Sequence, residues 1–297
     1  MSIKIRSLNK RYDNGYHALK DINIDIPTGM FGLLGPNGAG KSTFMRILVA
    51  LMEPSSGSIE AYGYDLLKQR KEVRQIIGYL PQDFRFFAKY TTYEYLDYAA
   101  RLSGFSKSNL RRQKVEQMLD QVGLFDVKER YASKLSGGMK RRLGIAQALI
   151  HKPKIIVVDE PTTGLDPQER IRFRNLLSAI SSDVTIILST HIVGDISSSC
   201  QQMALLNQGE LQFVGAPGDM IKAAEGSVWK LHVNNEQLKT ISSLYPVITT
   251  IPQGTGWEIQ CVAQDGVKGF EAESIMPNLE HAYVYYMEHH VGRWMND

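Results

Sequence analysis

The chain has 297 residues, of which 43% are apolar and 22% charged, so it can bury a core large enough for one large domain with an appendage or for two domains. Its formal net charge is only +3, which gives no bulk electrostatic argument for nucleic-acid binding, and we expect no specific nucleic-acid partner. Its two cysteines, Cys200 and Cys261, are too few and too far apart to suggest a disulfide framework or a thiolate metal site.

No targeting or membrane segment is evident in the sequence. Residues 1–6 (MSIKIR) lack the apolar core of a signal peptide, and no run approaches the roughly 18 uninterrupted apolar residues of a membrane span. We therefore expect a protein of the reducing cytosol, whose membrane role would depend on another chain.

The N-terminal segment has the alternation of short antiparallel strands. Ile3 and Ile5 alternate with polar neighbours, and so do Ile22, Ile24 and Ile26. Turns are predicted at 13–15 (DNG) and 27–29 (PTG). A small antiparallel β-layer is therefore expected before the glycine-rich segment that follows.

Residues 35–42 (GPNGAGKS) fit the phosphate-binding P-loop pattern G-x-x-x-x-G-K-[ST]. The context agrees, because 29–34 (GMFGLL) has the pattern of a short buried strand and 43–48 (TFMRIL) continues at helical spacing. The glycines let the backbone fold around a phosphate chain, Lys41 reaches the β- and γ-phosphates, and Ser42 offers a hydroxyl to Mg²⁺. The segment therefore predicts binding of a nucleoside triphosphate by Gly35, Pro36, Asn37, Gly38, Ala39, Gly40, Lys41, Ser42 and Thr43.

The pattern becomes helical between Asp83 and His151. Thr91 and Glu94 have capping-box spacing. A further apolar stripe lies at Leu110, Val115, Met118, Leu119 and Val122. Two basic runs, 111–114 (RRQK) and 140–142 (KRR), fall inside these helices, where a solvated face is the favoured interpretation and contact with lipid head groups or a partner is the alternative.

Two buried strands follow, each ending in polar side chains. Residues 155–158 (IIVV) run into Asp159 and Glu160, and 184–188 (VTIIL) run into 189–191 (STH). Continuous apolar runs of this length are typical of a parallel sheet buried on both faces, whose carboxyl ends face the ligand crevice. Asp166 has the position of a helix cap, with proline next and glutamate three residues on.

The remaining pattern predicts a hairpin at 205–213 and then a change of character. After 215–218 (GAPG) the alternation at 228–233 and 257–262 predicts a small α+β unit. We therefore expect an α/β fold: a P-loop NTPase core with a mostly parallel sheet, an N-terminal antiparallel β-layer, a helical insertion at about 83–150 and a small C-terminal α+β appendage. The expected domains are a nucleotide-binding domain, 1–215, and an accessory domain, 216–297.

Five further elements follow the P-loop in an order and spacing that closely resemble the ATP-binding-cassette (ABC) ATPases. The resemblance covers residues 1 to about 215. Gln82 after 79–81 (YLP) is similar to that family's Q-loop, 135–138 (LSGG) to its signature, and 164–166 (GLD) to its D-loop. Asp159 and Glu160 end the strand that binds magnesium in the family, and His191 matches its switch histidine.

The resemblance implies a catalytic group and a metal site at the strand ends. Successive side chains of a strand diverge, so the two adjacent acids are expected to have different tasks. Asp159 is assigned to Mg²⁺ together with Ser42 and Gln82, and Glu160 to orienting and deprotonating the attacking water. The catalytic residues are then Glu160, His191, Gln82 and Lys41.

The resemblance also implies that each ATP is clamped between two subunits. Ser136 caps a helix whose N-terminus is an anion site, and in the resembled family this site faces the γ-phosphate held by the opposite subunit. Ser136, Gly137, Gly138 and Asp166 are therefore predicted to contact nucleotide across a homodimer with two composite sites.

Three features of the sequence qualify the resemblance. Tyr12 fits the aromatic residue that stacks on adenine in the family, with Tyr16 close enough to compete. Met139 stands where the family signature usually has glutamine, and 139–143 (MKRRL) resembles a variant found in bacterial exporters whose membrane subunits are separate polypeptides. Residues 277–283 (PNLEHAY) are similar to a Pro-x-Leu-Glu-Asp-x-Phe element of such subunits, with His281 and Tyr283 as departures.

The resulting hypothesis is an ATP-hydrolysing subunit on the cytoplasmic face of the cell membrane, driving an integral membrane permease, with export as the direction. The alternative is a soluble ABC-type ATPase acting on nucleic acid, ribosomes or cluster assembly. An aromatic cluster after Gln82 is the candidate docking groove for the permease, with packing inside the insertion as an equal alternative. The cluster consists of Phe84, Phe86, Phe87, Tyr90, Tyr93, Tyr95 and Tyr98.

Overall fold

The computed structural model describes residues 3–87, 89–182 and 184–291. The described residues form two compact units, one within the ranges 3–191 and 199–211 and the other within 192–198 and 212–291. The division into a nucleotide-binding domain, 1–215, and an accessory domain, 216–297, stays a prediction. Among the described residues, no helix is both long enough and apolar enough to cross a membrane.

The first unit begins with the expected antiparallel layer. Its sheet has the order β2-β1-β4-β5. Ile3 pairs with Ile26 and Ile5 with Ile24, so the apolar positions of the first two strands share the buried face. The strands are β1 (Ile3–Arg11), β2 (His17–Ile26), β4 (Ser56–Ala61) and β5 (Tyr64–Asp65).

A second sheet, of six strands, follows the order β10-β9-β3-β8-β7-β6, and its strands other than β10 lie wholly in this unit. The pairs β3 with β8, β3 with β9, β7 with β8 and β6 with β7 are all parallel. Every residue of β3, β7 and β8 is buried, which confirms a sheet covered on both faces. The strands are β3 (Gly29–Leu34), β6 (Ile77–Leu80), β7 (Ile155–Asp159), β8 (Thr185–Thr190), β9 (Gln202–Asn207) and β10 (Glu210–Gly215).

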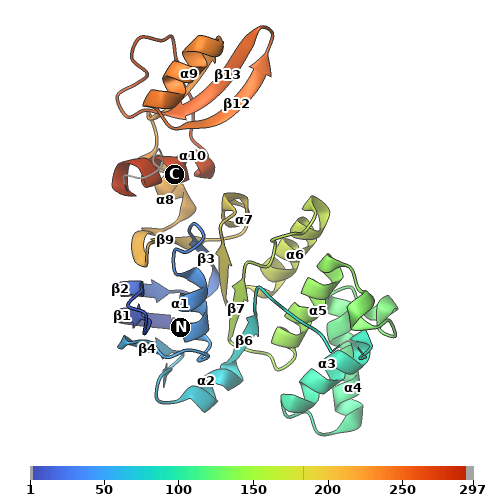
Figure 1. Ribbon diagram of the computed structural model, residues 1–297. Helices are drawn as coiled ribbons and strands as arrows, with labels where there is room; N and C mark the ends of the chain where they lie inside the picture. Colours follow the sequence, from blue (N-terminus) through green and yellow to red (C-terminus); the bar gives the residue numbers. More distant parts are fainter. Residues whose placement is uncertain (1–2, 88, 183, 292–297) are drawn as a thin grey trace. The chain divides into compact units, whose positions relative to one another are not determined.

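The two faces of the parallel sheet belong to two different cores. Ile155 and Val157 face a core shared with the antiparallel layer and with helix α1 (Lys41–Leu48). Ile156 and Val158 face a core shared with the helical insertion. Helix α2 (Arg70–Ile76) leads into β6, and α6 (Pro167–Ile180) leads towards β8 (Figure 1).

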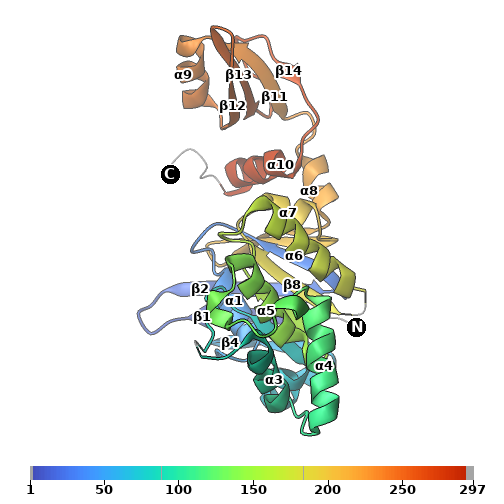
Figure 2. The ribbon, with the colours of Figure 1, turned by 90° about the vertical axis from the view of Figure 1, so that its right-hand side faces the viewer.

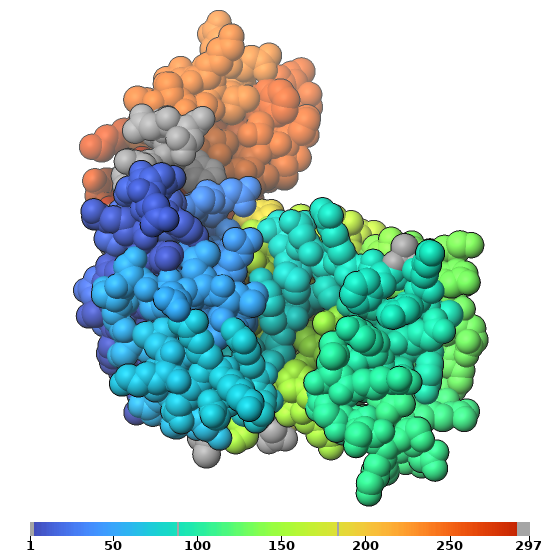
Figure 3. All heavy atoms as spheres, turned by 60° about the horizontal axis from the view of Figure 1, so that its bottom comes forward, coloured from blue at the N-terminus to red at the C-terminus, as the bar shows by residue number. Residues whose placement is uncertain are grey.

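The helical insertion comprises α3 (Thr92–Leu102), α4 (Ser108–Gln121) and α5 (Gly137–Leu149). The predicted capping box is present, because Glu94 N donates to Thr91 Oγ1 (3.2 Å) and Thr91 N donates to Glu94 Oε2 (2.8 Å). Short 3₁₀ segments at Phe125–Val127 and Ala132–Lys134 connect α4 to α5. In the space-filling view of Figure 3 the green insertion stands beside the blue and cyan N-terminal part, with a furrow between them.

The structure corrects in part the interpretation of the basic runs as a solvated face, because Arg112 is exposed whereas Arg111 and Arg142 are not. Arg111 is buried, and its Nε donates to Asp97 Oδ1 (2.6 Å), which joins α4 to α3. Arg142 Nη1 donates to the carbonyls of Val122 and Gly123 (2.9 Å each). The prediction of Leu110 in the apolar stripe is also wrong, since that side chain is 58% exposed. The stripe residues that α4 buries are Val115, Met118 and Leu119.

The second unit is built around a small antiparallel sheet of order β12-β13-β11-β14. Helix α9 packs with this sheet around a core that includes Leu231, Ile259 and Cys261, and burial raises the pKa of the Cys261 thiol to about 11. The elements are α7 (Val193–Ser197), α8 (Pro217–Ala223), β11 (Val228–Val233), α9 (Asn235–Leu244), β12 (Val247–Gln253), β13 (Gly256–Val262), β14 (Glu273–Ser274) and α10 (Leu279–Tyr286).

His281 has a structural task where the resembled tail element has an acid. Its backbone N–H donates to Asn278 Oδ1 (2.9 Å), and its Nδ1 accepts from the Asn278 backbone (3.2 Å), which completes a capping box for α10. The other ring nitrogen lies 2.9 Å from Gln260 Oε1 on β13. Burial lowers the pKa of His281, in keeping with a neutral ring whose Nε2 donates to the glutamine.

Candidate functional site

The P-loop connects β3 to α1 and requires glycine at two positions for steric reasons. A side chain at Gly35 would overlap the carbonyl oxygen of Leu206 on the neighbouring strand β9. Gly40 has φ of 108°, in the left-handed region, and a side chain there would meet the carbonyl of Ala18. The loop is therefore held against β9 and β2 as a tight backbone cradle at the start of α1.

Lys41 lies in the middle of this cradle. Its Nζ donates to the carbonyls of Gly35 (2.8 Å) and Pro36 (3.0 Å) and lies 3.4 Å from Glu160 Oε1. The residue is only 4% exposed, and this burial lowers the pKa of Lys41, while the nearby carboxylates of Glu160 and Asp159 partly counteract it. A buried cation is thus fixed where phosphate oxygens could replace the carbonyls.

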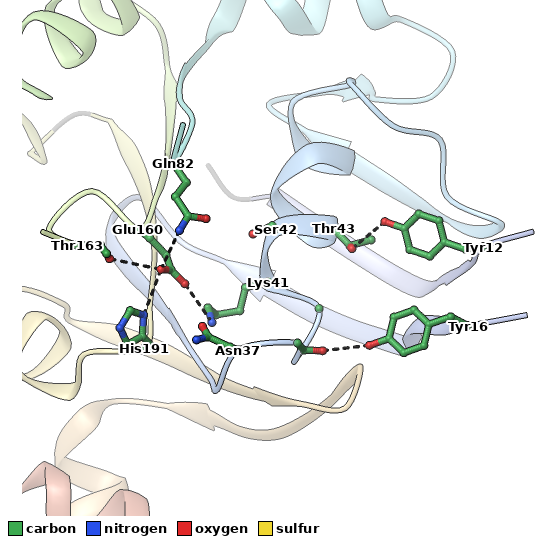
Figure 4. A pocket seen from close by; sticks show the side chains of 12 residues that line it. Tyr12, Tyr16, Asn37, Lys41, Ser42, Thr43, Gln82, Glu160, Thr163 and His191 are labelled. Carbon is green, nitrogen blue, oxygen red and sulfur yellow. Dashed lines mark hydrogen bonds and ion pairs between the residues drawn. The ribbon is translucent and has the colours of Figure 1, made fainter. Parts of the chain in front are cut away.

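A cavity of about 660 Å³ opens beside the cradle, large enough for a nucleotide-sized ligand. In Figure 4 two tyrosines lie at one end, Glu160 and His191 lie at the other, and Lys41 lies between them. The lining residues are Tyr12, Tyr16, Asn37, Gly38, Gly40, Lys41, Ser42, Thr43, Gln82, Glu160, Thr163 and His191. The structure therefore brings together at one cavity most of the P-loop residues, Gln82, Glu160 and His191.

Glu160 has the most contacts at the polar end. Its carboxylate accepts from Gln82 Nε2 (3.4 Å) and Thr163 Oγ1 (3.4 Å), and Oε2 lies 3.2 Å from His191 Nδ1. Its backbone has φ of 45°, a left-handed conformation that costs a non-glycine residue about 1–3 kcal/mol and is often found at functional sites. The Glu160 N–H donates to Ser189 O (3.1 Å), so β8 holds this turn in place.

Asp159 is the last residue of β7, directly before Glu160, and it makes different contacts from Glu160. It is 3% exposed and does not line the cavity of Figure 4. Its Oδ1 accepts a hydrogen bond from Ser189 Oγ. The two acids therefore have different surroundings, one beside the cavity and one within the sheet edge.

The apolar end of the cavity has two candidate stacking residues. Tyr12 and Tyr16 lie with ring centroids 6.3 Å apart and planes within 20° of each other. The Tyr12 hydroxyl shares a hydrogen bond with Thr43 Oγ1 (3.0 Å), and the Tyr16 hydroxyl donates to the Gly38 carbonyl (3.1 Å). Both rings are thus tied to the P-loop, and geometry does not separate them.

The signature residues do not line this cavity. Ser136 caps α5 by accepting from Met139 N (3.2 Å), and Asp166 caps α6 by accepting from Glu169 N (2.9 Å). Gly137 lines a second cavity of about 320 Å³, which adjoins the first because Gln82 and Thr163 line both, and a side chain at Gly138 would overlap the carboxylate of Glu169. In one chain, these four predicted nucleotide contacts do not share the cavity that holds Lys41.

A further contact joins α5 to the segment that holds Gln82. Arg141 Nη1 donates to the carbonyl of Pro81 (3.2 Å), immediately before Gln82. A side chain at position 144 would overlap Leu80 and Phe84. Because Gly144 has none, α5 can approach the end of β6 closely. The helix that begins at Ser136 is therefore packed directly against the strand end that positions Gln82.

Two polar residues of the site were missed by sequence reasoning. Ser189 bonds the Asp159 carboxylate and the Glu160 backbone, and Thr163 bonds the Glu160 carboxylate. Ser189 comes at the end of a buried apolar run, and Thr163 follows the acidic residues Asp159 and Glu160. Hydroxyl residues are also common in surface turns, so the sequence alone does not mark these two as site residues. Their roles depend on strand pairing, because Asp159 and Ser189 are register partners on β7 and β8.

The chain is similar to ABC transporter proteins over most of its length. The ABC transporter family matches residues 19–163. The uncharacterized ABC transporter ATP-binding protein YxlF of Bacillus subtilis is 36% identical, covering 79% of this chain and 77% of that protein. Methionine import ATP-binding protein MetN 1 of Acinetobacter baylyi is 37% identical, covering 79% of this chain and 65% of that protein.

Solved structures give the same result. The cbiO1 protein of Clostridium perfringens, part of the ABC transporter complex cbiONQ, is 30% identical with a TM-score of 0.69, over 74% of this chain and 90% of cbiO1. The dimeric cassette MJ0796, in a post-hydrolysis state bound to ADP and Pi, is 25% identical with a TM-score of 0.66, over 72% of this chain and 98% of that one.

These similarities agree with the cavity, the P-loop cradle and the acidic strand end. The expected P-loop α/β fold is confirmed. The chain belongs to the ABC transporter family as an ATP-binding subunit, and it is an ATPase that uses ATP and Mg²⁺.

Proposed function

We propose that two copies of this chain form a homodimer that clamps two ATP molecules and drives a membrane permease. The observation that carries this proposal is that Ser136, Gly137 and Gly138 do not line the cavity that holds Lys41. A helix N-terminus capped by serine is a suitable anion site, yet within one chain it has no place at that cavity. A second copy would supply it, and the dimeric cassette MJ0796 is a precedent for such an arrangement.

The residues of the cavity fit ATP and Mg²⁺ by their chemistry. The buried Lys41 ammonium and the backbone of the P-loop suit phosphate oxygens, and the tyrosine end suits the base. Ser42 and Gln82 of the cavity, together with Asp159 at the end of β7, would hold Mg²⁺ through hard oxygen ligands. When bound, the metal neutralises developing charge on the phosphates.

Glu160 is proposed as the group that orients and deprotonates the attacking water. Its contacts with Gln82, Thr163 and His191 hold the carboxylate at the polar end of the cavity, which is the γ-phosphate end if the base lies on the tyrosines. His191 contributes by fixing this carboxylate and by facing the γ-phosphate. Lys41 stabilises the charge that develops there.

We predict that Glu160→Gln keeps ATP binding and slows hydrolysis by about 10²–10⁴-fold, the usual contribution of a general base. Glutamine preserves hydrogen bonding but cannot accept the proton. Turnover is measured by phosphate release and ATP affinity by a fluorescent analogue. Glu129→Gln, at an exposed acid of the insertion, is the matched control and should leave both unchanged. A Glu160→Gln protein of undiminished turnover would remove Glu160 from the mechanism.

The composite site gives a second prediction. Turnover per protomer should rise with protein concentration, because each nucleotide needs the signature helix of another copy. Ser136→Arg should leave ATP binding by the monomer intact and abolish turnover, since a large cation replaces the cap at the shared seam. Ser106→Arg, at another exposed serine, serves as the control. Full activity of the Ser136→Arg protein at any concentration is the result that would refute the shared site.

The aromatic cluster after Gln82 divides into two sets in the structure. Phe84, Phe86, Tyr93 and Tyr95 pack with the insertion core. Phe87, Tyr90 and Tyr98 are 58%, 37% and 40% exposed and contact one another with ring centroids 5.6–6.1 Å apart. This second set, the aromatic triad, is our proposed docking point for the permease at the cytoplasmic face of the membrane.

We expect the double substitution Phe87→Ser with Tyr98→Ser to release the protein from the membrane fraction of its own cells while ATP binding persists. The triad rings are exposed, so their removal should leave the fold intact. Phe125→Ser, at another exposed ring of the insertion, is the control. Membrane co-fractionation after lysis measures the effect, and unchanged association of the double variant would place the permease contact elsewhere.

Export is the proposed direction of transport. Its support is the resemblance of 139–143 (MKRRL) and 277–283 (PNLEHAY) to exporter subunits, while the relative MetN 1 is named for import. Loss of an exporter raises the content of its substrate inside the cell relative to the medium, and loss of an importer lowers it. Metabolite profiles of cells carrying Glu160→Gln therefore decide the direction of transport. If metabolites are only depleted inside these cells, and none accumulates, the result contradicts export.

A further inference from the structure

A cavity of about 350 Å³ lies on the side of the first unit, away from the residues that line the nucleotide cavity. Figure 2 views the side that carries α4, α5 and α6, and α5 packs against both of the other helices. We call this the α4 cavity. Its lining residues are Lys114, Gln117, Met118 and Gln121 of α4, Leu149 at the end of α5, Lys152, Pro153, Ile180 at the end of α6, and Val184.

Two lysines face each other at this cavity. Lys114 is half-buried on α4, and Lys152 lies in the connection after α5 with φ of 56°. Burial and the neighbouring Lys152 ammonium lower the pKa of Lys114. Within residues 3–87, 89–182 and 184–291, no carboxylate oxygen lies within 4 Å of either Nζ. An anion placed between the two ammonium groups would replace this repulsion with attraction.

The rest of the cavity is apolar with an amide rim. Met118, Leu149 and Pro153 are buried, and Ile180 and Val184 are half-buried. Gln117 and Gln121 are exposed at the edge, where their amides can donate hydrogen bonds. Small-ligand sites typically combine an apolar lining with a few polar groups at volumes of about 300–1,000 Å³, and the α4 cavity is at the small end of that range.

We propose that the α4 cavity binds a small amphipathic carboxylate, with the carboxylate between Lys114 and Lys152 and an aliphatic body against Met118, Leu149 and Ile180. A bare anion would leave the apolar lining uncovered. A neutral aliphatic molecule would leave the two cations facing each other. Only a ligand with both features satisfies both parts of the site.

The site would connect two parts of the first unit. Lys114 and Met118 belong to α4 of the helical insertion, whereas Pro153 lies two residues before the core strand β7 and Val184 lies directly before β8. A ligand held between them binds the folded arrangement and not the unfolded chain, so it should raise the melting temperature of the whole protein.

The test is calorimetric titration of the full chain with sodium octanoate, with ADP present to occupy the P-loop. We expect saturable binding to the unsubstituted protein, and weaker binding of 1-octanol and of inorganic phosphate. Lys114→Gln and Lys152→Gln should each weaken octanoate binding by about tenfold or more, because tenfold is the lower end of the range for a lost hydrogen bond to a charged group. Lys107→Gln, which removes the same charge at an exposed position just before α4, should not.

Three results would overturn the proposal. If octanoate binds Lys114→Gln, Lys152→Gln and Lys107→Gln equally well, the lysines of the cavity do not hold its carboxylate. If phosphate binds as tightly as octanoate, the apolar lining does not contribute to affinity. If 1-octanol binds as tightly as octanoate, the two cations do not contribute to affinity. Because Lys152 is on an exposed connection, its substitution provides a well-folded variant even if Lys114→Gln proves unstable, and melting temperatures of both variants check this directly.

Discussion

The parallel pairing of β3, β8, β7 and β6 is the constraint on which the nucleotide site depends. Parallel strands end at the same edge of a sheet, so the P-loop after β3, Asp159 and Glu160 at the end of β7, His191 after β8 and Gln82 after β6 meet there. Burial of both sheet faces fixes the register, because a slip by one residue would exchange the two cores. The cores therefore fix the position of the catalytic edge.

No residue of the signature helix α5 lines the nucleotide cavity of its own chain. Gly138 allows α5 to approach Glu169 of α6, whose Oε2 lies 3.5 Å from Arg142 Nε, and Arg141 bonds the carbonyl before Gln82. The helix proposed to contact a neighbour's phosphate is thus packed against the segment that carries Gln82, a residue proposed to act at the nucleotide of its own chain. This gives a physical route between the two proposed nucleotide sites of a dimer.

Local signals in the sequence were sufficient to predict the positions of the P-loop, the strand ends and the helix caps, because each of these features depends on residues within a few positions of one another. Thr91, Ser136 and Asp166 all cap as predicted. Long-range features could not be predicted in the same way. The burial of Arg111 depends on Asp97 of another helix, and the role of Ser189 depends on its strand partner. The aromatic cluster likewise divides according to tertiary packing, which spacing does not specify.

Complementation between two inactive variants tests the composite site most directly. Lys41→Ala removes the P-loop cation and keeps the signature, whereas Ser136→Arg keeps the P-loop and blocks the signature. In a mixed dimer, one site combines the intact P-loop of one copy with the intact signature of the other. The account predicts that each variant alone is inactive and that mixing them restores part of the ATPase activity. Failure of the mixture to regain activity while mixed dimers form, or full turnover by either variant alone, would contradict it.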